Sequence, residues 1–425
     1  MSAMKISTEE FLLNTVSVAF IFTSTFVLLP LRRGIDSRFV VDMAFLLVGA
    51  LVLLLSRRVD LGILDSFLAV TRRRLTSSLS ARWRKVLMPI SIYVFAFLLL
   101  VFRVLRMGAS VDFDEPLHLE LTKSFATFDL GSWIEAFAVD PIRRLNPPLP
   151  YFLMAILLRP LDFPLFAGRL ILCLFAAIIP VVLLYMAREV CVESTTAIAV
   201  PFAYTLSTLY QGALFKYDFD ALSTLFFTLC VYSFIVAMNR KQRLYFGYSM
   251  IAWILLILTK YPPAGWLFLG FMLTSFFHKE LRSHLGFILL ALLVALLMVV
   301  AVLPAQLGYV AEFFIKMEPM SMEYAVPLFR DFAVVIGWSP YLAIAFKLKE
   351  AVKGTRDLIS TFSVVLIILA FISPIIYPLT RRVIQVIPLL VMTLANFSTG
   401  RWSRTTSLLI LMNVCWWEVI RLPYL

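Results

Sequence analysis

The chain has 425 residues, a formal net charge of +12, 61% hydrophobic residues and only 15% charged residues. Its mean hydropathy is +0.93, whereas globular domains are roughly 45–50% apolar and about 25% charged. A soluble core cannot enclose so much apolar side chain, because the surface needs polar cover. The composition therefore excludes a cytosolic enzyme, a nucleic-acid-binding module, a disordered chain and a secreted disulfide scaffold, and it indicates an integral membrane protein.

A transmembrane helix needs about 20 mostly apolar residues, and about thirteen segments of this sequence are candidates for such helices. The predicted fold is therefore all-α, a polytopic transmembrane helical bundle. The expected spans begin near Phe11, Phe39, Leu87, Phe166, Thr195, Phe219, Leu244, Pro262, His284, Phe332, Leu358, Val383 and Thr405.

We expect three parts along the chain. Residues 1–86 hold two amino-terminal spans and a basic cytoplasmic segment, residues 87–398 form a core of spans, and residues 399–425 form a final span. Two long connections, residues 108–165 and 306–330, fall on the same side of the predicted core.

The distribution of Lys and Arg predicts the orientation, because short cytoplasmic loops are enriched in both. Basic runs at residues 57–85, 240–243 and 279–282 fall on one side of the predicted bundle, which we assign to the cytoplasm. The stretch from Asn146 to Leu161 is apolar, but a crossing there would put the later basic loops on the wrong side. We therefore expect a juxtamembrane helix that lies at the outer surface or dips into it.

The first long connection carries Asp114, Glu115 and His118 just outside the third predicted span. Carboxylates and an imidazole so close in sequence can bind a cation or accept a proton from a substrate. The alternative is an ordinary solvated loop, because exposed acidic loops are common.

A second acidic group, Tyr217, Asp218 and Asp220, is expected on the same outer face. In an extended or turn backbone, residues two apart point the same way, so the two carboxylates could share one metal ion, with Asp114 as a further candidate ligand. The alternative is that they cap the next helix, whose first turn favours negative charge.

Three cations are expected on the outer face, where the positive-inside pattern does not explain them: Lys260, Arg381 and Arg382. Each suits a phosphate ligand, although snorkelling of the side chain to the membrane interface is the alternative. Asn146, which precedes two prolines, is a weaker candidate, because prolines at a helix start are ordinary.

The order and common side of these motifs resemble the GT-C glycosyltransferases, polytopic enzymes that use a sugar carried on polyprenyl phosphate. Protein O-mannosyltransferases, lipid A aminoarabinose transferases and oligosaccharyltransferases are the similar groups. The resemblance covers about residues 87–396, and Asn146 and Arg382 depart from it, because they stand where a His or Lys and an aromatic residue are usual. The motifs that carry it are Phe113-Asp114-Glu115 with His118, Asn146-Pro147-Pro148-Leu149 with Tyr151, Tyr217-Asp218-Phe219-Asp220, Lys260-Tyr261, and Arg381 with Pro388.

The resemblance implies an inverting transfer of a sugar, mannose or another hexose, to an acceptor hydroxyl at the outer or lumenal face of a plasma membrane or endoplasmic reticulum. The acceptor could be a protein, a glycan or a lipid, and a partner subunit is an open option. The implied catalytic residues are Asp114 and Glu115. The resemblance implies that the donor phosphate is bound by Lys260, Arg381 and Arg382, and that substrate is bound by His118, Asn146 and Tyr217. A divalent cation such as Mg²⁺ or Mn²⁺ is a candidate at Asp218 and Asp220.

Two other classes of function stay open at this point. A transporter or flippase would place its charges near the bilayer midplane and show two related halves. A non-catalytic subunit of a membrane glycosylation complex would use the acidic connection to bind its partner.

Overall fold

The computed structural model describes part of the chain: residues 81–108, 110–111, 114–129, 131–133, 147–190, 194–205, 214–302, 358–376 and 388. The chain divides into two compact units, Met1–Met88 and Pro89–Leu425. Apart from the first residues of α4, everything described below lies in the second unit.

The longer described elements are all helical, which confirms the predicted all-α class. Three of them are long and apolar enough to cross a membrane, over Val86–Met107, Leu165–Val190 and Asp220–Arg240. The helices are α4 (Ala81–Met107), α5 (Glu115–Phe125), α7 (Leu149–Leu158), the 3-10 helix η3 (Arg159–Leu161), α8 (Leu165–Val190), α9 (Ser194–Thr205), α11 (Asp220–Arg240), α12 (Arg243–Ile257), α13 (Tyr261–Phe277), α14 (Lys279–Arg282), α15 (Leu285–Val302) and α19 (Leu358–Ile376).

The predicted starts from Leu87 to His284, and the start at Leu358, each fall inside a helix or one residue before it. The remaining predicted spans, near residues 11, 39, 332, 383 and 405, lie outside the described residues, so the number of about thirteen spans stays a prediction.

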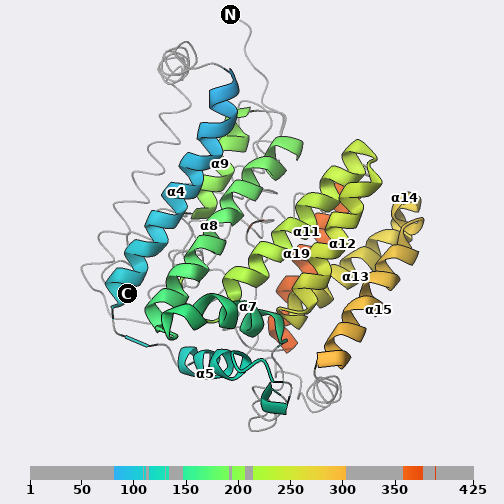
Figure 1. The fold of residues 1–425 in the computed structure, drawn as a ribbon. Coiled ribbons are helices and arrows are strands. Elements are labelled where there is room, and N and C mark those ends of the chain that lie inside the picture. The colour runs from blue at the N-terminus through green and yellow to red at the C-terminus, as the bar shows by residue number, and fades with distance from the viewer. Residues whose placement is uncertain are drawn as a thin grey trace, which may run out of the picture. The chain divides into compact units, whose positions relative to one another are not determined.

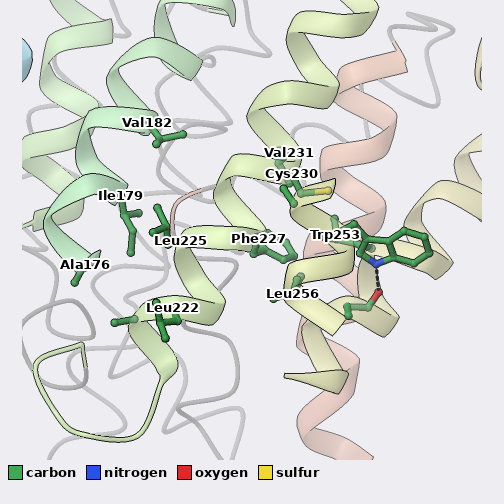
Figure 2. Packing of buried hydrophobic residues seen from close by; sticks show 14 of the residues in the cluster. Ala176, Ile179, Val182, Leu222, Leu225, Phe227, Cys230, Val231, Trp253 and Leu256 are labelled. Atoms are coloured by element: carbon green, nitrogen blue, oxygen red, sulfur yellow. Dashed lines mark hydrogen bonds between the residues drawn. The ribbon is translucent and has the colours of Figure 1, made fainter. Parts of the chain in front are cut away.

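The centre of the second unit is formed by α8, α11 and α12, which pack in that order (Figure 1). Ile179 of α8 lies beside Leu225 of α11, and Phe227 of α11 faces the side of α12 that carries Leu256 (Figure 2). On α12 the fully buried Trp253 donates its indole N–H to the Ala264 carbonyl oxygen, 3.0 Å away, which links α12 to α13. α13 in turn packs against α19.

The basic connections lie at one end of these helices and the acidic motifs at the other. α11 reaches its basic end at Arg240, and the short α14 (Lys279–Arg282) follows the corresponding end of α13. At the opposite end, α5 and α7 run across the starts of α8 and α11 (Figure 1). The structure therefore separates the two sets of charges as the Lys and Arg pattern predicts.

The helix expected between Asn146 and Leu161 is present as α7 and η3. With ten residues, α7 is only about 15 Å long, too short to cross a bilayer whose apolar core is about 30 Å thick. One of its faces, with Tyr151, Met154 and Leu158, is buried, while Phe152 and Ile156 on the other face are exposed. α7 therefore covers the interior of the unit at this end with one face and exposes the other face.

Candidate active site

The first feature of the site is a buried ion pair between Glu115, the first residue of α5, and Arg169, in the second turn of α8. Arg169 Nε lies 2.9 Å from Glu115 Oε1, and Nη2 lies 2.6 Å from Oε2. The side chains are 2% and 0% exposed. A two-pronged contact of this kind is the strongest geometry for an arginine and a carboxylate, and it fixes both planes.

The same two side chains also hold backbone from other segments. Arg169 donates to the carbonyl oxygens of Gly108, at 3.2 Å, and Ser110, at 2.7 Å. Glu115 Oε1 accepts the backbone N–H of Tyr217 at 2.9 Å. The pair thus connects the first acidic motif to the second, although about 100 residues of sequence separate them.

Tyr217 is fully buried between α5 and α8. Its hydroxyl lies 2.9 Å from that of Thr122, which donates to the His118 carbonyl oxygen, so Tyr217 is the donor to Thr122. Burial raises the pKa of the Tyr217 phenol, so this side chain is a neutral hydroxyl near neutral pH. Its ring occupies the space over Gly168 of α8, where a Cβ atom would lie 2.6 Å from Tyr217 Cε2.

His118 lies in a cluster of aromatic rings above this contact. Its Nδ1 is hydrogen-bonded to the Tyr151 hydroxyl at 2.9 Å. The Phe219 ring meets His118 edge to face at a centroid distance of 5.1 Å and Tyr151 at 5.0 Å. Phe219 has a φ of +61°, a conformation that is uncommon for a bulky residue and that tends to occur at functional sites.

This unusual turn places two carboxylates at the start of α11. The backbone N–H of Asp220 donates to Asp218 Oδ1 at 3.1 Å. The buried Asp220 carboxylate, through Oδ1, pairs with the ammonium group of Lys260, which is 26% exposed and immediately precedes α13. The second acidic motif therefore already holds a cation supplied by the chain.

Two further contacts close the site. Asp114 stands at the start of α5 as a partly exposed residue, and its carbonyl oxygen accepts the backbone N–H of His118 at 3.1 Å. The backbone N–H of Leu149, the first residue of α7, donates to the Leu258 carbonyl oxygen at 3.1 Å. This bond brings the wall formed by α7 to the segment that carries Lys260.

The described site residues predicted from the sequence therefore gather at one end of the unit: Asp114, Glu115, His118, Tyr217, Asp218, Asp220 and Lys260. Asn146, Arg381 and Arg382 lie outside the described residues. Sequence reasoning missed Arg169, although an arginine inside the apolar run of α8 is the signal that could have found it, because a charge in a span is costly unless it is paired.

The divalent cation expected at Asp218 and Asp220 stays a prediction. Within the described ranges, no three His, Cys, Asp or Glu side chains are grouped so that they could hold a metal ion. Asp220 is engaged by Lys260, so a metal ion at Asp218 and Asp220 would compete with an ammonium group.

The helical membrane fold resembles that of a solved GT-C transferase. The chain is similar to the crystal structure of ArnT from Cupriavidus metallidurans bound to undecaprenyl phosphate, with a TM-score of 0.57 and 18% sequence identity, over 81% of this chain and 66% of that one. At this identity the likeness shows the fold. No curated protein sequence matches the chain.

The family evidence comes from the sequence. Residues 145–304 match the dolichyl-phosphate-mannose-protein mannosyltransferase family. This segment holds α7 to α15, and with them Arg169, Tyr217, Asp220 and Lys260. The match covers less than half of the chain and agrees with the predicted resemblance to GT-C glycosyltransferases.

The packing of Tyr217 on Gly168 yields a test of the site. We expect Gly168→Ala to displace the Tyr217 ring, because a rigid ring cannot yield to a Cβ atom 2.6 Å away. The strain should destabilise the protein by about 1–3 kcal/mol and weaken the hydrogen bond to Thr122. The measurement is the melting temperature of the purified protein in detergent, with turnover per folded molecule.

The matched control is Gly247→Ala in α12, where an added Cβ atom meets no neighbouring atom within 4 Å. Alanine favours a helix over glycine by about 0.5–1 kcal/mol, so this variant should melt at the parent temperature or slightly above it. Equal melting temperatures for the two variants would contradict the packing role given to Gly168.

Proposed function

We propose that the protein transfers a sugar from a polyprenyl-phosphate carrier to an acceptor hydroxyl, with inversion at the anomeric carbon. The observation that carries the proposal is that Asp114, a partly exposed residue, and the Lys260 ammonium group come from distant segments to the same end of the unit. One can accept a proton and the other can stabilise an anionic leaving group. The undecaprenyl phosphate in the ArnT crystal structure supports a donor of this chemistry.

Lys260 is proposed to bind the donor phosphate. When the bond between the anomeric carbon and the phosphate oxygen breaks, both bonding electrons stay with the phosphate, which gains negative charge. Lys260 is partly exposed and lies at the start of α13, so it can share its protons between Asp220 and a phosphate. Arg381 and Arg382 are predicted to join it.

Asp114 is proposed as the general base. The acceptor hydroxyl attacks the anomeric carbon from the face opposite the phosphate, and its proton passes to the Asp114 carboxylate. Glu115 was expected to share this role, but its carboxylate is fully buried and bonded to Arg169 and to the Tyr217 N–H. We therefore assign Glu115 to holding the site rather than to proton transfer.

His118, Asn146 and Tyr217 were expected to bind substrate. In the structure the His118 imidazole and the Tyr217 hydroxyl contact Tyr151 and Thr122. We propose that the side chains of His118 and Tyr217, with their partners Tyr151 and Thr122, form a hydrogen-bonded layer next to Asp114, and that the bound sugar contacts this layer.

The family match favours mannose or another hexose as the sugar and a protein hydroxyl as the acceptor, with a glycan or a lipid as the other acceptors to be tested. The same match favours the enzyme over the transporter and over the non-catalytic subunit. A transporter would require charges near the middle of its spans, whereas the charges of the described site lie at helix ends.

The first prediction from the proposed function concerns turnover. The purified protein should release or transfer sugar from a member of a panel of radiolabelled polyprenyl-phosphate sugars, with membrane extract as acceptor. Asp114→Asn should lower the rate by about 10²–10⁴-fold, since an amide cannot accept the proton. Glu120→Gln, an exposed carboxylate on the same helix, is the control and should retain the parent rate; a comparable loss there would remove the special role of Asp114.

A second prediction separates lysine from metal. If Lys260 supplies the positive charge, Lys260→Gln should slow turnover by about 10²-fold or more, while chelation by EDTA should leave the parent rate unchanged. A parent enzyme that loses its activity in EDTA and regains it with Mn²⁺ or Mg²⁺ would reinstate the metal ion expected at Asp218 and Asp220.

A third prediction concerns the face of the membrane. We propose that the site faces the outside or the lumen, so a cysteine introduced at Lys123 of α5 should react with a membrane-impermeant maleimide in intact cells. A cysteine at Gln242, in the connection between α11 and α12, should react only after the membrane is opened. Both positions are exposed, and the described native cysteines, Cys173 and Cys230, are buried. The reverse labelling pattern would place the site on the cytoplasmic face.

A further inference from the structure

We infer that Arg169 is a positioning residue for the transfer step: with Glu115 it fixes the segment that carries Asp114 against the second acidic motif. This inference rests on the proposed function, because it assumes that Asp114 is the base. Arg169 does not itself reach the exterior, since it is 2% exposed.

The contacts of Arg169 surround the base in sequence. On one side of Asp114 its Nη1 and Nη2 atoms donate to the carbonyl oxygens of Gly108 and Ser110. On the other side, Nε and Nη2 donate to the two carboxylate oxygens of Glu115, the next residue in the chain. One rigid guanidinium thus tethers the backbone before and after Asp114 to the same point on α8.

The second half of the argument is the link to the phosphate end of the site. Glu115 Oε1 accepts from Arg169 and, at the same time, from the backbone N–H of Tyr217. Tyr217 leads directly into Asp218 and the turn that presents Asp220 to Lys260. Glu115 therefore links the segment of the proposed base directly to the segment that leads to the proposed phosphate cation, beside the Tyr217–Thr122 hydrogen bond.

The energetics of buried charge favour a positional role over a purely stabilising one. A buried ion pair is often no more stable than a pair of apolar side chains of similar size, because both ions lose their hydration. An apolar pair cannot supply the directed hydrogen bonds that join Arg169 to Gly108 and Ser110 and join Glu115 to Tyr217. Displacement of a catalytic group by about 1 Å can lower a rate by about 10²-fold.

The decisive variant is the double replacement of Arg169→Met and Glu115→Met, which removes both charges together and leaves neither one buried alone. We expect kcat, counted per donor-binding molecule, to fall by about 10²-fold. The KM for the donor should change by less than about threefold, because Lys260 and Asp220 are untouched. Only the number of active molecules, and not kcat per donor-binding molecule, would fall if the pair merely stabilised the fold.

Arg169→Lys serves as the second variant, which keeps a charge but loses the forked geometry. It should show the same loss of kcat with a similar donor KM, and it decides the matter if the double variant does not fold. Arg188→Lys, an exposed arginine near the other end of the same helix, is the matched control and should behave like the parent.

Parent-like kcat in the folded double variant or in Arg169→Lys would overturn the inference. Failure of the proposed function is distinguishable, because it would show as a parent enzyme that turns over none of the polyprenyl-phosphate donors. A parent that is active and an Asp114→Asn variant that is not would establish the base, and the Arg169 variants then test only its positioning.

Discussion

The arrangement of the site depends on one constraint: a charged side chain in an apolar environment must be paired. Arg169 enters the interior with α8, and Glu115 meets it with both oxygens. The enclosed pair also bonds the backbone of Gly108, Ser110 and Tyr217, which belong to the segments that carry the two acidic motifs. The hydrogen bonds that the buried Arg169 and Glu115 need in place of water thus also fix the backbone on both sides of Asp114.

The membrane imposes the second constraint, which separates the charges by helix end. Basic connections follow α11 and α13 at one end, and Asp114, Asp220 and Lys260 gather at the other. Between the two ends, α8, α11 and α12 bury apolar side chains against one another (Figure 2). α5 and α7 are too short to span and lie across this second end, where Tyr151 faces the site and Phe152 does not.

Much of this could be read from the sequence, because apolar length and basic loops are local properties. The starts of α8, α11 and α13, near Phe166, Phe219 and Pro262, follow from these properties directly, and the acidic motifs are recognised by their order. The role of Glu115 was not predictable, since it depends on Arg169, which is 54 residues away. The same holds for Gly168, whose missing side chain has meaning only once the Tyr217 ring is known to lie over it.

The electrostatics of the second motif suggest how donor binding and catalysis are linked. In the structure, Lys260 and Asp220 neutralise each other, so the ammonium is held in place by a carboxylate before any donor arrives. In the proposed mechanism, a bound donor phosphate would add negative charge beside this pair, and this charge would increase further as the sugar leaves. One lysine shared with Asp220 balances only part of that charge, which is the physical reason to expect further cations from Arg381 and Arg382. If Arg381 and Arg382 did not reach the site, the negative charge on the leaving phosphate would be only partly balanced. A metal ion would then be needed to balance the rest.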